Sequence, residues 1–127
     1  MRNKHVQTIC EMTEKLKRNL DQMSEDQKKR YSKKISEMFE EIELLMLGIL
    51  LAYYGPVTYQ VNESELPDAT KKEARQEILD RQWLEKERGK GMVVDAIKNG
   101  HAKALLTAWE NELLVTRENL AAKYIGY

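Results

Sequence analysis

The run of residues 42–54, Ile-Glu-Leu-Leu-Met-Leu-Gly-Ile-Leu-Leu-Ala-Tyr-Tyr, limits what this chain can fold into more than any other part of it. As a helix it would carry apolar side chains on nearly every side, so it must be buried by this chain or by another one. Residues 31–42 are apolar only at every third or fourth position, as in a helix that lies on a surface. A helix over residues 25–54 would be about 45 Å long, which exceeds the diameter of a small domain. We therefore expect a long helix whose first half lies on a surface and whose apolar second half is surrounded.

The composition favours a single helical domain. The 127 residues are 42% hydrophobic and 33% charged and include only 2 prolines. A chain of this length can bury roughly two-thirds of its unfolded surface, and a composition rich in Glu, Lys, Leu and Ala favours helix. We predict an all-α fold, a bundle of four to five helices with residues 42–54 at its centre. Because the 21 basic and 21 acidic residues balance, binding of polyanions over the whole surface is not expected.

The first two helix boundaries are marked by a capping pattern and a breaker. Ser24-Glu25-Asp26-Gln27 has the spacing of a capping box, in which the Ser and Gln side chains each satisfy a backbone amide. It predicts that the first helix ends near Met23 and that the second begins near Glu25. Gly55-Pro56 is expected to end the second helix, because Gly favours a left-handed C-terminal residue and Pro cannot continue the hydrogen-bond ladder.

The rest of the chain is predicted to be an extended segment followed by further helices. Residues 57–61 alternate and are rich in β-branched side chains, which indicates an extended loop or an edge strand offered to another subunit. Helices are expected over residues 69–88, 92–97 and 102–124, with a break at Gly89-Lys90-Gly91. The predicted domain of residues 1–127 thus comprises a long helical hairpin over 3–54, an extended linker over 55–67 and C-terminal helices over 68–125.

The later helices can cover only part of the apolar segment. Trp83 is a further candidate for an inward-facing position. The inward-facing residues expected to cover the segment are Ala74, Ile78, Leu79, Leu105, Leu106, Trp109 and Leu113. These side chains would cover about two faces, which leaves one face for a protein partner or a second copy of the chain. Tyrosines suit the edge of a core or an interface, because their hydroxyl groups can reach water. The candidate interface residues are Leu44, Leu47, Leu51, Tyr53, Tyr54 and Tyr59.

A cationic run precedes the apolar segment. It consists of Lys28, Lys29, Arg30, Lys33 and Lys34. Such runs are usually the solvated face of a helix, and the alternative is contact with phosphates or with an acidic protein surface. Any contact with nucleic acid would be weak, salt-sensitive and directed at the backbone rather than at the bases.

No signature of catalysis, metal binding or cofactor binding stands out. His5 and His101 lack the Glu-x-x-His or His-x-x-x-His spacing of metal sites,, and the glutamates near residue 40 have no second titratable partner for acid–base work. Cys10 is the only cysteine, so neither an internal disulfide nor a Cys-based zinc site is expected. We predict no catalytic, metal-binding or cofactor-binding residues, no small-molecule substrate and no enzymatic activity.

Neither membrane insertion nor secretion by a signal peptide is expected. The apolar segment is shorter than the roughly 20 residues that a membrane-spanning helix needs, and no apolar stretch of the signal-peptide kind follows the N-terminal Met1-Arg2-Asn3-Lys4-His5,.

The order of these features resembles the N-terminal region of phage minor head proteins, the portal-associated head-morphogenesis family. The resemblance lies in the opening Met1-Arg2-Asn3-Lys4, the charged helix over residues 28–43, the apolar stretch that ends in Tyr-Tyr-Gly, and Val57-Thr58-Tyr59 before another charged helix. It covers about the first two-thirds of the chain. It implies a virion component near the portal, present in several copies, without enzymatic activity in this part.

Two functional hypotheses follow from the sequence. The first is a non-enzymatic structural or assembly protein that acts through helix packing with itself or within a larger complex, most simply in a phage head or neck. The second is a small helical regulator that binds a nucleic acid or nucleoprotein, such as a phage-encoded inhibitor or a transcription factor. Either would be found in the virion or the cytoplasm.

Overall fold

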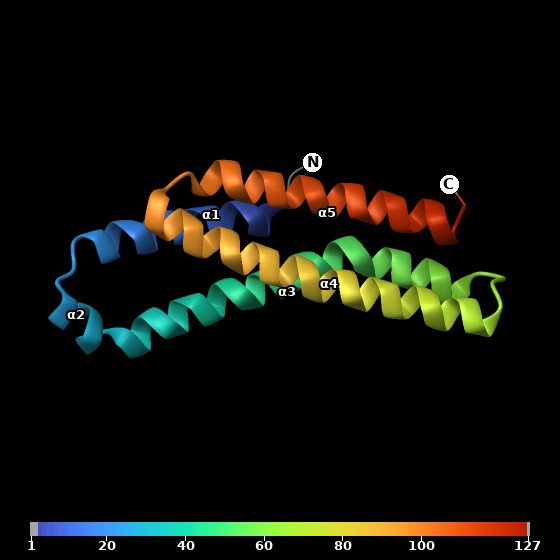
Figure 1. Cartoon of the computed structure of the whole chain (residues 1–127), viewed down its shortest axis with the longest axis horizontal. Coiled ribbons are helices and arrows are strands. Elements are labelled where there is room, and N and C mark those ends of the chain that lie inside the picture. Colours follow the sequence, from blue (N-terminus) through green and yellow to red (C-terminus); the bar gives the residue numbers. More distant parts are fainter. Residues whose placement is uncertain (1–2, 127) are drawn as a thin grey trace.

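The computed structural model describes residues 3–126, and this part of the chain forms five helices and no strand (Figure 1). The prediction of an all-α bundle is confirmed. The helices are α1 (Lys4–Asp21), α2 (Glu25–Arg30), α3 (Ser32–Glu63), α4 (Asp68–Asn99) and α5 (Ala102–Tyr124).

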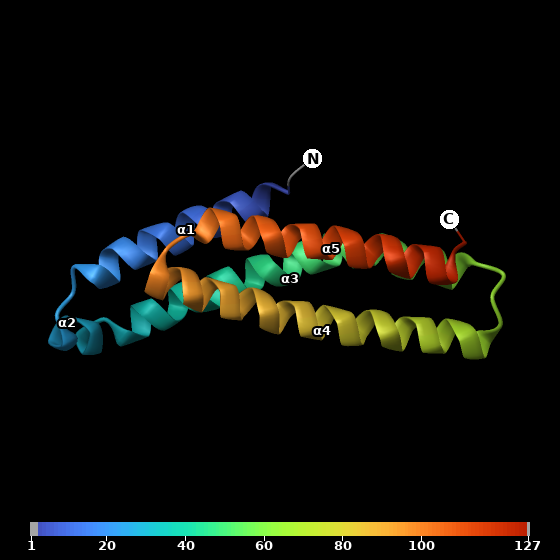
Figure 2. The ribbon, with the colours of Figure 1, turned by 45° about the horizontal axis from the view of Figure 1, so that its top comes forward.

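Helices α3, α4 and α5 run back and forth along the molecule, each antiparallel to the one before it, and α1 covers only half of the length of the bundle. In Figures 1 and 2, α1 begins near the middle of the bundle and runs back to the end where α2 turns the chain into α3. One half of the bundle therefore has four helices and the other half has three. Helix α1 packs against α3, α4 and α5. It therefore closes the core in its own half of the bundle.

The capping box at Ser24 is present as predicted. The hydroxyl oxygen of Ser24 accepts a hydrogen bond from the backbone N–H of Gln27 at 3.2 Å, and the Gln27 side chain accepts one from the backbone N–H of Ser24 at 2.9 Å. The predicted long helix from residue 25 is interrupted once, at Tyr31, where the chain turns from α2 into α3. The first helix ends at Asp21, two residues before the predicted position.

The prediction that Gly55-Pro56 ends the helix and begins an extended linker is wrong. Helix α3 continues through Pro56 to Glu63, so residues 57–61 are helical and not a loop or a strand. A proline inside a helix costs about 3 kcal/mol, but α3 gains burial on both sides of it. Tyr53 and Tyr54 precede Pro56 and are buried, and Val57 and Val61, four residues apart, are buried after it. The spacing of the valines thus fits a helical face better than a strand.

The predicted break at Gly89-Lys90-Gly91 is also wrong, because α4 is continuous over 32 residues. Gly89 makes room for another side chain and is not a hinge, because a Cβ atom placed on it would lie 2.9 Å from Cε2 of Trp109. Trp109 is fully buried on α5, and its indole N–H donates a hydrogen bond of 2.9 Å to the backbone oxygen of Glu85. The glycine lets the ring lie directly on the backbone of α4.

A buried carboxylate fixes the start of α1 against the middle of the bundle. Oε2 of Glu110 accepts a hydrogen bond of 2.6 Å from the Tyr53 hydroxyl and one of 2.9 Å from the backbone N–H of Asn3. The Asn3 side chain also caps α1 by accepting a hydrogen bond from the backbone N–H of His5. The Arg117 guanidinium lies 5.3 Å from the centre of the Tyr53 ring. The bundle changes from four helices to three at this point.

The two glycines of α4 give a matched test of this packing. Gly89→Ala is expected to lower the free energy of unfolding by about 1–3 kcal/mol, because the added methyl group would displace the Trp109 ring. Gly91→Ala is expected to raise it by up to about 1 kcal/mol, because alanine is the better helix former and a Cβ there meets no atom within 4 Å. Urea denaturation of both variants measures the difference. Equal effects of the two substitutions would contradict the close packing of the Trp109 ring on the backbone at Gly89.

Candidate protein interface

The apolar segment of α3 is buried on one side and exposed on the other. Ile42, Met46, Ile49 and Leu50 lie in the core, as expected for the centre of the bundle. On the opposite side, 68% of Leu44, 39% of Leu47 and 64% of Leu51 are exposed. These three leucines were predicted as interface residues, and the structure places them together on the side of α3 that faces away from the core.

Two of the predicted interface residues, Tyr53 and Tyr54, lie in the core instead. Only 6% of Tyr53 is exposed and none of Tyr54. Burial, together with the hydrogen bond to Glu110, raises the pKa of the Tyr53 hydroxyl to about 12. Both residues are therefore closed to a partner, and the prediction was wrong because α3 does not end beside them. Tyr59, the last predicted interface residue, is exposed one turn beyond Pro56.

The α4 helix adds two exposed side chains that were predicted to face inward. Leu79 is 57% exposed and Trp83 is 62% exposed. The core of α4 is formed by Ala74, Ile78 and residues on their side of the helix. Leu79 comes directly after Ile78, so it points roughly 100° away from it, and Trp83 follows Leu79 by one turn on the same side.

Polar contacts fix which residues of α3 and α4 lie level with each other. Near one end, the Nζ atoms of Lys86 and Lys90 lie 3.9 and 3.6 Å from Oε1 of Glu43. Near the other end, the Arg75 guanidinium donates a hydrogen bond of 3.0 Å to the side-chain oxygen of Asn62. Since the two helices are antiparallel, a step of one turn up α3 corresponds to a step of one turn down α4.

This register brings the exposed apolar residues of the two helices together. Leu47 lies one turn after Glu43, and Trp83 lies one turn before Lys86, so Leu47 and Trp83 are level. One further turn makes Leu51 level with Leu79. We call the resulting patch the α3–α4 surface; it consists of Leu44, Leu47, Leu51, Leu79 and Trp83. The sequence predicts the three leucines of α3 as interface residues, whereas on α4 its only sign of the patch is the four-residue spacing of Leu79 and Trp83.

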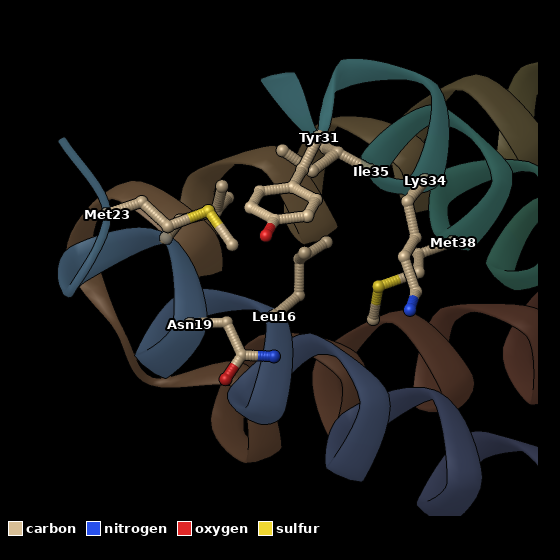
Figure 3. A pocket seen from close by; sticks show the side chains of 8 residues that line it. Leu16, Asn19, Met23, Tyr31, Lys34, Ile35 and Met38 are labelled. Atoms are coloured by element: carbon tan, nitrogen blue, oxygen red, sulfur yellow. The ribbon is translucent and has the colours of Figure 1, made fainter. Parts of the chain in front are cut away.

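The predicted cationic residues lie together at the α2 corner of the bundle. Four of them are exposed, namely Lys29, Arg30, Lys33 and Lys34. The fifth, Lys28, forms an ion pair in which its Nζ atom lies 3.4 Å from Oε1 of Glu25. Figure 3 shows Tyr31 projecting from this corner towards Leu16 and Met23 of the α1 end. A cleft of about 190 Å³ lies between the α1 end and the start of α3, lined mainly by apolar side chains and by Lys34 at its edge.

A polar cluster that the sequence did not indicate lies between α4 and α5. It contains the buried Glu85 and its neighbour Glu112, whose Oε1 atom lies 2.6 Å from a guanidinium nitrogen of Arg88. Burial raises the pKa of the Glu85 carboxyl, and the charge of Glu112 raises it further. Burial and the charge of Glu85 likewise raise the pKa of Tyr54 to about 12. The cluster makes stability depend on pH.

The described residues show neither a metal site nor a membrane span. In residues 3–126, histidine, cysteine and acidic side chains do not gather in threes in a way that could hold a metal ion. Within the same residues, every helix is too short or too polar to cross a membrane. The chain matches no model of a protein family, no curated protein and no solved structure.

Replacement of the buried carboxyl tests the polar cluster. The pKa of Glu85 is higher in the folded state than its ordinary value of 4.5, so its contribution to stability is lost as the pH rises above that value. Glu85→Gln is therefore expected to raise the free energy of unfolding near pH 7 and to have much less effect near pH 4. Urea denaturation at both pH values measures this, with Glu87→Gln on the exposed side of α4 as the control. An equal effect of Glu85→Gln at the two pH values would contradict a raised pKa of the Glu85 carboxyl in the folded protein.

Proposed function

We propose that this protein is a non-enzymatic assembly protein whose α3–α4 surface packs against another protein. The observation that carries the proposal is the exposure of five large apolar side chains, from two helices, in one patch. Taken together, their exposed parts amount to on the order of 500 Å². Monomeric proteins seldom expose a contiguous apolar patch larger than a few hundred Å², and patches of that size mark interaction sites.

The size of the patch fits one side of an interface. A standard protein–protein interface buries about 800 Å² on each partner, and its centre is apolar and rich in aromatic residues, with a polar rim. Trp83 is of the type that dominates binding energy at such centres. The ion pairs of Glu43 with Lys86 and Lys90 lie at one end of the patch, as in a polar rim.

The resemblance to phage minor head proteins supplies a context for this role. A virion component near the portal would be present in several copies and would be held by helix packing. This context is part of the proposal and rests on the order of the sequence features alone.

The alternative is a regulator that contacts nucleic acid through the α2 corner. The observation in its favour is that Lys29, Arg30, Lys33 and Lys34 are exposed together at one end of a molecule whose net charge is zero. A cluster of this kind can neutralise phosphates without reading a base sequence.

Introduction of negative charge on the α3–α4 surface tests the assembly role. In a lysate of the cells that make the protein, the wild-type chain is expected to sediment with a larger complex. The double variant Leu44→Glu, Leu51→Glu is expected to sediment as free protein, because a charge at the centre of an apolar interface would lose its hydration. Both side chains are exposed, so the fold is expected to change by no more than about 0.5 kcal/mol in stability.

Val115→Glu is the matched control, because Val115 is 59% exposed but lies on α5. It should leave the sedimentation unchanged. A wild-type chain that sediments free of any larger complex would contradict the assembly role, and so would a double variant that stays in the complex.

A titration with duplex DNA tests the alternative. If the corner contacts phosphates through four cations, affinity is expected to fall roughly 100-fold between about 50 and 200 mM salt. Reversal of Lys29, Arg30, Lys33 and Lys34 to Glu should abolish the binding. The control reverses four exposed lysines elsewhere, namely Lys15, Lys72, Lys98 and Lys103. Equal losses in the two variants would show that only the overall charge matters, and would count against a binding site at the corner.

A further inference from the structure

We propose that the partner at the α3–α4 surface is a second copy of this chain, with the two α3 helices packed antiparallel across a twofold axis at Ile49–Leu50. This inference rests on the proposed assembly role and names its partner. It follows from the pattern of large and small residues on the exposed side of α3.

Large and small residues alternate along the exposed line of α3. Leu44, Gly48, Leu51 and Gly55 follow one another at spacings of four, three and four residues, which is the spacing of a seam between two packed helices. The leucines project as knobs, since 68% of Leu44 and 64% of Leu51 are exposed. The glycines leave hollows, since a Cβ atom placed on Gly48 or on Gly55 would meet no atom within 4 Å.

The alternation is self-complementary in the antiparallel direction. Leu44 and Gly55 lie equally far from the midpoint between Ile49 and Leu50, and so do Gly48 and Leu51. A twofold axis through that midpoint therefore places each leucine of one copy opposite a glycine of the other. The same operation pairs Leu47 with Ala52, another large residue with a small one. A twofold interface has to be self-complementary in this way.

The protein already uses a glycine hollow inside its own bundle. The Trp109 ring lies on Gly89, at a distance that excludes a side chain there. Glycine in the middle of a helix costs about 1 kcal/mol relative to alanine. At Gly89 the contact with Trp109 offsets this cost, and in the dimer the leucines of the second copy would do the same at Gly48 and Gly55.

The polar residues beyond the apolar line match as well. The twofold operation places Glu40 opposite Tyr59 and Glu37 opposite Asn62. All four side chains are exposed. The Tyr59 hydroxyl can donate a hydrogen bond to a carboxylate. Because the Asn62 side-chain oxygen accepts from Arg75, its amide nitrogen is left to donate. Acceptors on one copy thus face donors on the other.

The charge and the area also favour a second copy. The chain has no net charge at pH 7, so two copies do not repel each other at long range. Two patches on the order of 500 Å² would bury about 1,000 Å² in all, which is the least that a biological interface is expected to bury.

Cross-linking tests the antiparallel geometry. We place Glu40→Cys on one batch of full-length chain and Tyr59→Cys on another, both with Cys10→Ala, and treat them with a short bis-maleimide. The mixture is expected to give cross-linked dimers, because the two positions face each other. Each variant alone should give few, because its two cysteines would lie about 28 Å apart along the helices. Efficient cross-linking of a single variant with itself, or none in the mixture, would overturn the proposal.

Filling the hollow is the second arm. Gly48→Leu is expected to weaken dimerisation at least tenfold in sedimentation velocity while leaving the monomer folded by circular dichroism. Gly91→Leu is the control, because Gly91 is equally open but lies on α4, and it should leave dimerisation unchanged. A Gly48→Leu chain that still dimerises like the wild type would overturn the proposal. If the purified wild type is monomeric but the cellular chain sediments in a larger complex, the second copy is wrong and the assembly role stands.

Discussion

A helix that is apolar on every side needs neighbours on every side, and this constraint governs the whole structure. Over residues 42–54, α3 has neighbours only towards the core, where α1, α4 and α5 pack against it. The core side takes Met46, Ile49 and Leu50, and the other side leaves Leu44 and Leu51 in water. The helices α1, α4 and α5 cannot also cover the outer side of α3, because each of them turns its own apolar face towards the shared core. The exposed leucines are therefore the part of the apolar segment that the chain itself leaves uncovered, and we propose that a partner protein buries them.

The positions of α3 and α5 depend on a few close contacts. Trp109 lies on Gly89 and bonds to the backbone of α4, which fixes α5 on α4. Glu110, the next residue, gathers the Tyr53 hydroxyl and the backbone of Asn3 onto one oxygen. Two adjacent residues of α5 thus position α4, α3 and the start of α1. These contacts hold the core side of α3 in place, so the backbone of its exposed side is already positioned before a partner binds.

Local rules in the sequence predicted the helical class and the capping box at Ser24, and they failed where packing overrides them, as at the predicted helix end Gly55-Pro56. The capping box at Ser24 depends on four neighbouring residues, so its pattern is visible in the sequence. Pro56 and Gly89 look like breakers, but burial of Val57 and Val61 and the fit of Trp109 keep both helices continuous. The exposed leucines of α3 were predicted because the segment has more apolar faces than the chain can cover. Leu79 and Trp83 were assigned to the core, because the side of α4 that faces inward depends on its register with α3.

We propose that the exposed side of α3 is a contact surface for a second copy of the chain. Light scattering coupled to size exclusion on the wild-type chain, over a wide range of concentrations, tests it most directly. We expect a mass of 14.9 kDa on dilution that rises with concentration to twice that value and stops there, as for a closed twofold interface. A mass that stays at that of one chain at every concentration would contradict it.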